Sequence, residues 1–181
     1  MSLFSAVAMA PRDPILGLNE QYAADPNPQK VNLGVGVYFD DNGKLPLLQC
    51  VQAAEKALMD TPTARGYLPI DGIAAYDNAV KALVFGADAE PVTSGRVATV
   101  QAIGGTGGLK IGADFLHKLN PNAKVLISDP SWENHRAIFQ NAGFEVDTYA
   151  YYDAAKRGVN FDGMLQSLRS AAPGTIAVLH A

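Results

Sequence analysis

Residues 98–128 read ATVQAIGGTGGLKIGADFLHKLNPNAKVLIS, and this segment sets the pattern for the rest of the chain. Two β-rich runs, 98–103 and 124–128, enclose a segment with apolar side chains at helical spacing. The alternation continues with a helix near 134–142, a strand at 144–149, a helix near 161–171 and a strand at 175–180. Strands and helices in this order predict the α/β class, with a mostly parallel sheet flanked by helices.

The first helix of this series is expected at about 107–119. Ile111, Phe115 and Leu119 follow one another at intervals of four residues, and they predict an apolar face that lies on the sheet. The opposite, polar face is predicted to carry Lys110, Asp114, His117 and Lys118.

The first part of the chain has a different pattern. Five prolines fall between residues 11 and 46, which leaves room for short extended pieces, such as 31–39, but not for long helices. The α/β core is therefore expected to begin after this segment. Two helices are predicted next, at about 49–60 and 73–85.

The composition excludes several classes of function. Of the 181 residues, 48% are hydrophobic and 18% are charged, as in folded globular proteins. The net charge of −4 does not favour binding to nucleic acid or to anionic membranes, and neither is an expected partner. No apolar run approaches the roughly 20 residues of a membrane-spanning helix. Three scattered histidines without a His-x-x-x-His pair predict no metal site.

The sequence favours a cytoplasmic location. The single cysteine, Cys50, can form no internal disulfide, so nothing requires an oxidising compartment. Residues 8–10 read AMA and resemble a signal-peptide cleavage site. No basic residue precedes Arg12 and the apolar run is short, so we expect no secretory signal.

The strongest local signal is the glycine-rich turn IGGTGG at 103–108, between a predicted strand and a predicted helix. Glycines allow a ligand to approach the backbone, and a helix N-terminus offers free N–H groups that bind phosphate. Neither a dinucleotide fingerprint nor a Walker A loop is present. The alternative is a flexible turn in which Thr106 caps the helix.

A second signal is SDPSWENH at 128–135, at the predicted carboxyl end of a strand, where α/β proteins bind ligands. Trp132 could stack on a planar aromatic ligand, or simply pack the loop. His135 could contact a ligand or orient a neighbour, and His180 ends the last strand on the same side. The alternative for both histidines is a structural, hydrogen-bonded imidazole.

Five motifs, in order, resemble the amino-terminal half of aspartate and aromatic amino acid aminotransferases. They are NLGVGVY (32–38), YLPIDG (67–72), GGTG (104–107), SDPSWENH (128–135) and VLHA (178–181). These enzymes have fold type I and depend on pyridoxal 5′-phosphate (PLP). The resemblance begins at Asp13, and it implies a transaminase that moves an amino group between aromatic amino acids or aspartate and 2-oxoglutarate.

The resemblance also assigns roles to single residues. It implies that Gly105 and Thr106, with Gly104 beside them, bind the cofactor phosphate. Trp132 would stack on the pyridine ring. His135 would stand behind the carboxylate that pairs with the pyridine nitrogen.

Further roles follow from the same resemblance. His180 would stand behind the same carboxylate as His135. Tyr67 would reach the phosphate of the neighbouring subunit's cofactor, which implies a homodimer. Gly36 and Ile15 would lie along the substrate entrance.

The resemblance divides the chain into an amino-terminal arm with the start of the small domain (1–46) and the first part of a large cofactor-binding domain (47–181). The family pattern continues beyond Ala181 with the Schiff-base lysine and the substrate-binding arginines, so the chain is expected to be truncated. None of the eight lysines present matches that lysine. We therefore expect no catalytic residue in this chain, and no activity from it alone.

Two questions stay open at the level of sequence. One alternative to the enzyme is a non-catalytic α/β module that binds a phosphorylated ligand or a partner. The other question is substrate preference. Segments 67–72, 83–88, 112–116 and 132–135 look closer to bacterial aromatic amino acid aminotransferases than to strict aspartate enzymes, which favours dual specificity.

Overall fold

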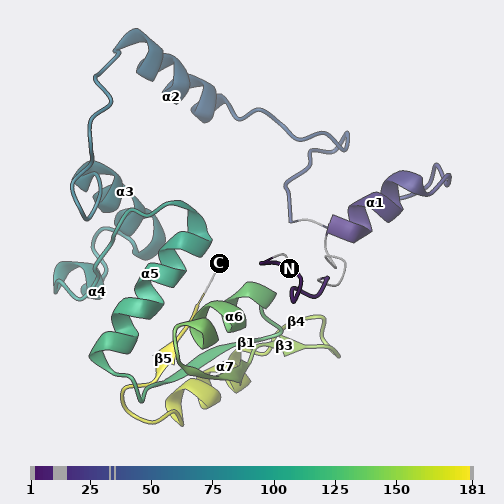
Figure 1. Ribbon diagram of the computed structural model, residues 1–181. Coiled ribbons are helices and arrows are strands. Elements are labelled where there is room, and N and C mark those ends of the chain that lie inside the picture. Colours follow the sequence, from purple (N-terminus) through teal and green to yellow (C-terminus); the bar gives the residue numbers. More distant parts are fainter. Residues whose placement is uncertain (1–2, 10–15, 33, 35, 180–181) are drawn as a thin grey trace. The chain divides into compact units, whose positions relative to one another are not determined.

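The computed structural model describes residues 3–9, 16–32, 34 and 36–179 (Figure 1). The chain divides into two compact units, Met1–Arg65 and Gly66–Ala181. The division into an arm and a cofactor-binding domain at residue 46 stays a prediction.

The first unit contains two helices, α1 (Leu16–Ala24) and α2 (Gln49–Asp60). Helix α2 has the predicted bounds. Helix α1 was not predicted from the proline pattern, but it forms in the proline-free stretch between Pro14 and Pro26. The described residues of 31–39 form no strand.

The second unit is built on a three-stranded parallel sheet, which confirms the predicted fold class. Its order is β2 (Glu145–Ala150), β1 (Lys124–Asp129) and β5 (Ile176–Ala177), with β1 in the centre. Val125 of β1 pairs with Val146 on one side and with Ile176 on the other. The strands predicted at 124–128 and 144–149 are therefore confirmed within one residue. The third is shorter than predicted.

Three helices accompany this sheet: α5 (Gly104–Leu119), α6 (Glu133–Asn141) and α7 (Phe161–Arg169), as Figure 1 shows. Helices α5 and α6 contact each other, and α7 lies along β2. The helices predicted at 134–142 and 161–171 are confirmed. The core consists of Ala113, Ala123, Val125, Ile127, Ile138, Phe139, Phe144, Val146 and Val178. Burial of each larger side chain contributes about 1.5–3 kcal/mol.

The prediction for residues 98–103 was wrong, because this segment is not a strand. A strand needs a neighbour that exchanges backbone hydrogen bonds with it along its length. Among the described residues, the backbone of this segment makes one hydrogen bond of this kind, from the N–H of Gln101 to the carbonyl of Asp71 at 3.0 Å. A β-rich composition without such a neighbour gives an extended segment.

The prediction of which face of α5 packs on the sheet was also wrong. Ile111, Phe115 and Leu119 are 63%, 59% and 66% exposed. The sheet instead receives the face that carries Leu109, the fully buried Ala113 and Leu116. This face also has helical spacing, and the small Ala113 allows the helix to approach the strands closely.

The rest of this unit consists of shorter elements. Helix α3 (Ala74–Phe85) confirms the helix predicted at 73–85, and α4 (Glu90–Thr93) is a single turn. Strands β3 (Tyr152–Asp153) and β4 (Gly158–Val159) form an antiparallel hairpin. In the turn of this hairpin, the Asp153 carboxylate accepts a hydrogen bond from the N–H of Lys156. This bond lowers the pKa of Asp153 below its ordinary value.

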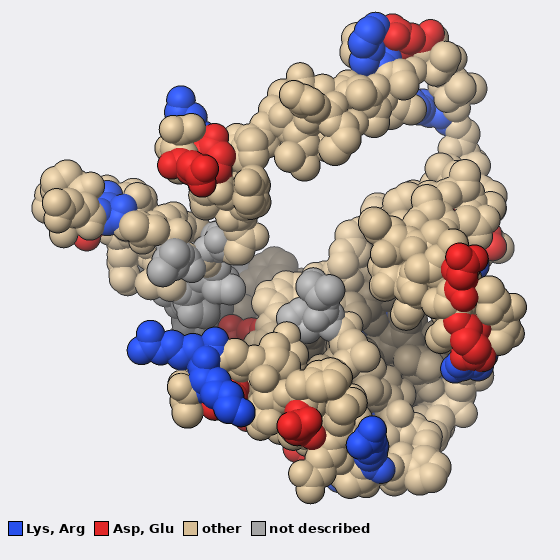
Figure 2. Space-filling model, turned by 180° about the vertical axis from the view of Figure 1, so that it is seen from behind, with Lys and Arg blue, Asp and Glu red and all other residues tan. Residues whose placement is uncertain are grey.

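Charged side chains are distributed in small groups on the surface. On the face in Figure 2, the charged residues form small separate groups, in several of which basic and acidic side chains lie side by side, among wide uncharged areas. Two ion pairs each lie within one helix, Lys56 with Asp60 in α2 and Lys110 with Asp114 in α5. Pairs of this kind stabilise an exposed helix only weakly.

Candidate functional site

The N-terminus of α5 forms the first part of the candidate site. The helix begins at Gly104, three residues earlier than predicted, so Thr106 lies in its first turn and does not cap it. Gly104 has a φ of +66°, a conformation that glycine adopts without strain. The residue before it, Ile103, provides no side-chain cap, and the first turn carries no acidic residue.

This helix end has the properties of an anion site. In a helix of 16 residues the first N–H groups have no partner within the helix, and the helix dipole places partial positive charge there. Gly104, Gly105 and Thr106 are exposed, and a Cβ built on either glycine would meet no atom within 4 Å. The open backbone, the free N–H groups and the Thr106 hydroxyl fit a phosphate group.

The turn between β1 and α6 forms the second part. Trp132 precedes the first residue of α6 and is 39% exposed. His135 lies one turn into the helix and is 5% exposed. The Nδ1 atom of His135 lies 2.9 Å from the hydroxyl oxygen of Ser131, and the two rings of Trp132 and His135 meet edge to face at 5.3 Å. The indole therefore stays partly accessible while it packs against a fixed imidazole.

A hollow adjoins this turn at the carboxyl end of β1. It is lined by Ile127, Ser128, Asp129, Pro130, Ser131, Trp132, Glu133, Arg136 and Thr148. The guanidinium of Arg136 donates to the backbone carbonyl of Val146 at 2.6 Å, which ties α6 to β2. The position of this hollow agrees with the rule that α/β sheets bind ligands at the carboxyl ends of their strands.

Ser128, which lines the hollow, belongs to a buried polar pair whose second member, Tyr149, the sequence does not single out. Ser128 and Tyr149 face each other in the β1–β2 register and are each 2% exposed. Burial raises the pKa of the Tyr149 phenol, and the nearby Ser128 hydroxyl lowers it by less. The Ser128 hydroxyl itself makes no hydrogen bond of normal geometry among the described residues. In the sequence Tyr149 looks like any other residue of a β-strand. Its hydrogen-bonding role becomes visible only in the structure, where its side chain is buried.

The comparison with known proteins decides the family. Residues 28–181 match the family described as "Aminotransferase class I and II". The chain belongs to this aminotransferase family.

Several relatives are similar along the whole chain. The aspartate aminotransferase of Pseudomonas aeruginosa is 62% identical over 181 residues, which are 100% of this chain and 46% of that protein. The aromatic-amino-acid aminotransferase of Escherichia coli is 45% identical over 98% of this chain and 45% of its own length. This aminotransferase chain thus spans less than half the length of the relatives it matches.

Solved structures agree in fold. The aromatic-amino-acid aminotransferase from Burkholderia pseudomallei, covalently bound to pyridoxal phosphate, has 66% identity and a TM-score of 0.84. That match covers 99% of this chain and 45% of the other. The fold of this aminotransferase chain is therefore the amino-terminal part of the fold type I architecture.

The remaining predicted site residues of this aminotransferase chain lie elsewhere. Tyr67 is fully exposed in the loop before α3, and Gly36 is exposed in the first unit. Ile15 and His180 lie outside the described residues. The structure therefore brings Trp132 and His135 into contact, and the cofactor and substrate roles of all these residues stay proposals.

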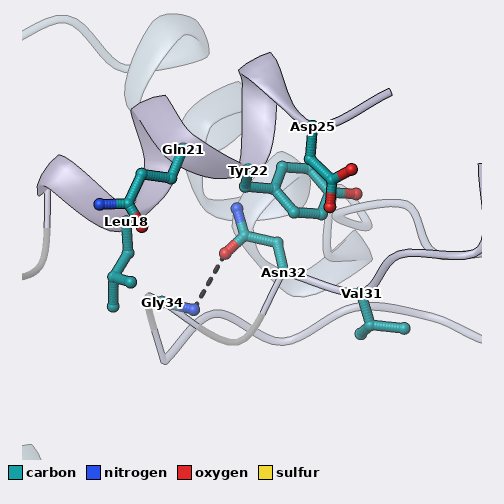
Figure 3. Close-up of a pocket in the computed structure, with 7 residues that line it drawn as sticks. All are labelled: Leu18, Gln21, Tyr22, Asp25, Val31, Asn32 and Gly34. Carbon is teal, nitrogen blue, oxygen red and sulfur yellow. Dashed lines mark hydrogen bonds between the residues drawn. The ribbon is translucent and has the colours of Figure 1, made fainter. Parts of the chain in front are cut away.

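A second hollow lies near the NLGVGVY motif in the first unit (Figure 3). The Asn32 side chain fixes this segment, because its Oδ1 accepts the N–H of Gly34 at 2.9 Å and its Nδ2 donates to Asn19 of α1 at 2.9 Å. Leu18 and Tyr22 of α1 contribute apolar surface to the wall. Asn32 therefore joins its segment to α1 by one hydrogen bond.

Two further findings concern the described part of the chain. No helix there combines the length and the apolar character that crossing a bilayer requires. Within the same residues, no group of three histidine, cysteine, aspartate or glutamate side chains could hold a metal ion.

Proposed function

We propose that this chain forms the amino-terminal, cofactor-holding part of a PLP-dependent aminotransferase. The complete enzyme moves an amino group between aromatic amino acids or aspartate and 2-oxoglutarate. The observation that carries the proposal is the presence, in the same compact unit, of an uncapped, exposed helix N-terminus at Gly104–Thr106 and of the partly exposed indole of Trp132. A phosphate group and a planar aromatic ring are the two parts of PLP that these features match.

Each residue has a distinct task in this proposal. The N–H groups of Gly105 and Thr106 and the Thr106 hydroxyl bind the phosphate, with Gly104 giving the turn its shape. Trp132 stacks on the pyridine ring and excludes water from one of its faces. When bound, PLP supplies the electron sink for the carbanion chemistry of transamination.

The imidazole of His135 is a positioning group in this proposal. Its Nδ1 is held by Ser131 and its ring packs against that of Trp132, so it fixes the indole while staying buried. His180 has a similar supporting task near the pyridine nitrogen. Gly36 and Ile15 line the substrate entrance.

The active form is proposed to be a homodimer in the cytoplasm. The full exposure of the Tyr67 side chain supports the dimer, because it leaves the side chain available for its proposed contact with the cofactor phosphate of the neighbouring subunit. The relation would be reciprocal in a two-fold dimer. The single cysteine, Cys50, agrees with a reducing compartment.

A direct experiment tests the activity and the substrate class together. The protein expressed from its complete reading frame is loaded with PLP and supplied with 2-oxoglutarate and either tyrosine, phenylalanine or aspartate. We expect kcat/KM values for the aromatic substrates within about tenfold of that for aspartate, because a buried ring gains about 25 cal/mol per Å². If kcat/KM for tyrosine and phenylalanine were several orders of magnitude below that for aspartate, the aromatic part of the proposal would be wrong and only the aspartate aminotransferase activity would remain.

The second candidate is a non-catalytic module that binds a phosphorylated ligand through the α5 N-terminus. The exposed glycines of that helix end favour it independently of any reaction. Such a module would retain PLP or a simpler phosphate ester but would form no glutamate from 2-oxoglutarate. The assay above therefore separates the two candidates.

A further inference from the structure

Gln101 makes two hydrogen bonds to the loop that follows Tyr67, one to Asp71 and one to Ile73. Its backbone N–H donates to the carbonyl of Asp71 at 3.0 Å. Its side-chain Oε1 accepts the N–H of Ile73, also at 3.0 Å. The two bonds lie on either side of Gly72, so they fix both the position and the direction of the loop.

The contact between this loop and Gln101 is close enough to require glycine at position 72. Gly72 is buried, has a φ of +102°, and its N–H bonds to the carbonyl of Pro69 at 3.0 Å. A Cβ at this position would stand 2.3 Å from the Cβ of Gln101 and 2.9 Å from its Oε1. No side chain fits there, so the backbone of the loop packs directly on Gln101.

Gln101 also stands close in sequence to the phosphate-binding turn. It lies three residues before Gly104, where α5 begins, while Tyr67 lies four residues before Asp71. Apart from the bond to Asp71, the backbone of segment 98–103 makes no hydrogen bond to another part of the chain that the structure describes. Gln101 is thus the point at which the Tyr67 loop and the entry to α5 are joined.

We propose that Gln101 is a positioning residue that sets the Tyr67 loop relative to the phosphate-binding turn at Gly104–Thr106. The inference rests on the proposed function, in which Thr106 serves the phosphate in its own subunit and Tyr67 serves the phosphate in the neighbouring one. Gln101 touches neither cofactor. It acts through Tyr67, and it links the phosphate contacts of the two sites of the dimer.

The test uses Gln101→Met in the protein expressed from its complete reading frame, because methionine has a similar length and lacks the acceptor for the Ile73 N–H. Gln166→Met, on the exposed face of α7, is the matched control. The PLP dissociation constant is measured by equilibrium dialysis, with and without Tyr67→Phe. Hydrogen exchange of the Ile73 amide is followed in the absence of PLP.

We expect Gln101→Met to raise the PLP dissociation constant about two- to tenfold, the range of one hydrogen bond. With Tyr67→Phe present, the same substitution should change it less than twofold, because its route to the phosphate has been removed. Exchange at Ile73 should accelerate in Gln101→Met and stay unchanged in Gln166→Met. Gly72→Ala adds a Cβ that pushes the loop away from Gln101. It should also raise the PLP dissociation constant, and it should do so less when Tyr67→Phe is present.

Two results would overturn the inference while leaving the proposed function in place. One is an unchanged dissociation constant in both Gln101→Met and Gly72→Ala. The other is a rise of the PLP dissociation constant in Gln101→Met by the same factor with and without Tyr67→Phe, which would show that Gln101 does not act through Tyr67. A wild-type protein that binds no PLP would instead overturn the proposed function itself.

Discussion

The hydroxyl of Tyr149 donates a hydrogen bond of 3.0 Å to the backbone carbonyl of Val178, across the central strand of the sheet. Tyr149 belongs to β2, and Val178 follows β5 on the other side of β1. Both residues are buried. The bond therefore links the chain at the two outer strands at the carboxyl end of the sheet.

Removal of this hydroxyl should destabilise the protein. Tyr149→Phe keeps the ring but leaves the buried carbonyl of Val178 without its donor, which costs about 1–3 kcal/mol. Urea unfolding at neutral pH measures the change. Tyr152→Phe, in the exposed hairpin, is the control and should change the free energy of unfolding by less than about 0.5 kcal/mol. Equal midpoints for Tyr149→Phe and wild type would contradict the role of this bond.

The same residue predicts an alkaline loss of stability. Burial raises the pKa of Tyr149 above its ordinary value of 10.0, so the unfolded chain loses this proton at lower pH than the folded one. The contribution is complete below pH ~10 and is lost as the pH rises through the folded pKa. We expect the free energy of unfolding to fall less steeply between pH ~9 and ~11 in Tyr149→Phe than in wild type. Parallel profiles of the two proteins would contradict this.

Thr106 should contribute strongly to cofactor binding. Thr106→Val removes a hydroxyl donor to a phosphate dianion, and such bonds contribute about 1.5–3 kcal/mol. The PLP dissociation constant should therefore rise roughly 10- to 100-fold. Thr93→Val on the exposed helix α4 is the matched control, and equilibrium dialysis is the measurement. If both variants bind PLP as the wild type does, the glycine-rich turn has only a structural role.

Trp132 should report cofactor binding directly. It is the single tryptophan of these 181 residues and is partly exposed beside the hollow. Stacking on the pyridine ring should quench its fluorescence when PLP is added, and this component of the signal should be absent in Trp132→Phe. A titration that quenches both proteins equally would place the cofactor away from the indole.

Tyr67 should complement Thr106 across the dimer. In a heterodimer of one Tyr67→Phe subunit and one Thr106→Val subunit, both defects fall on one site and the other site keeps both groups. We expect one high-affinity PLP site per heterodimer, although each homodimer is impaired. Differently tagged subunits, purified as a pair, allow this measurement. Two weak sites in the pair would show that Tyr67 acts within its own subunit.

Local patterns in the sequence predicted much of the fold. The β-rich runs at 124–128 and 144–149 and the helix at 49–60 agree with the structure within one residue or better. Alternation and helical spacing are properties of neighbouring residues, so they are readable without tertiary contacts. The two parts of the candidate site were likewise predicted from the sequence, from the glycine-rich turn and from the motif around Trp132. Each part consists of residues that are close together in the sequence.

Other features depend on contacts between distant residues, and only the tertiary structure decided them. The segment 98–103 has β-rich composition but no paired neighbour, so it forms no strand. Helix α5 carries two apolar stripes, and packing on the sheet selected the one with Ala113. The bonds of Tyr149 to Val178 and of Gln101 to Ile73 join residues 29 and 28 positions apart. A hydrogen bond over such a separation depends on where folding places its partner, and no local pattern of side chains encodes that position.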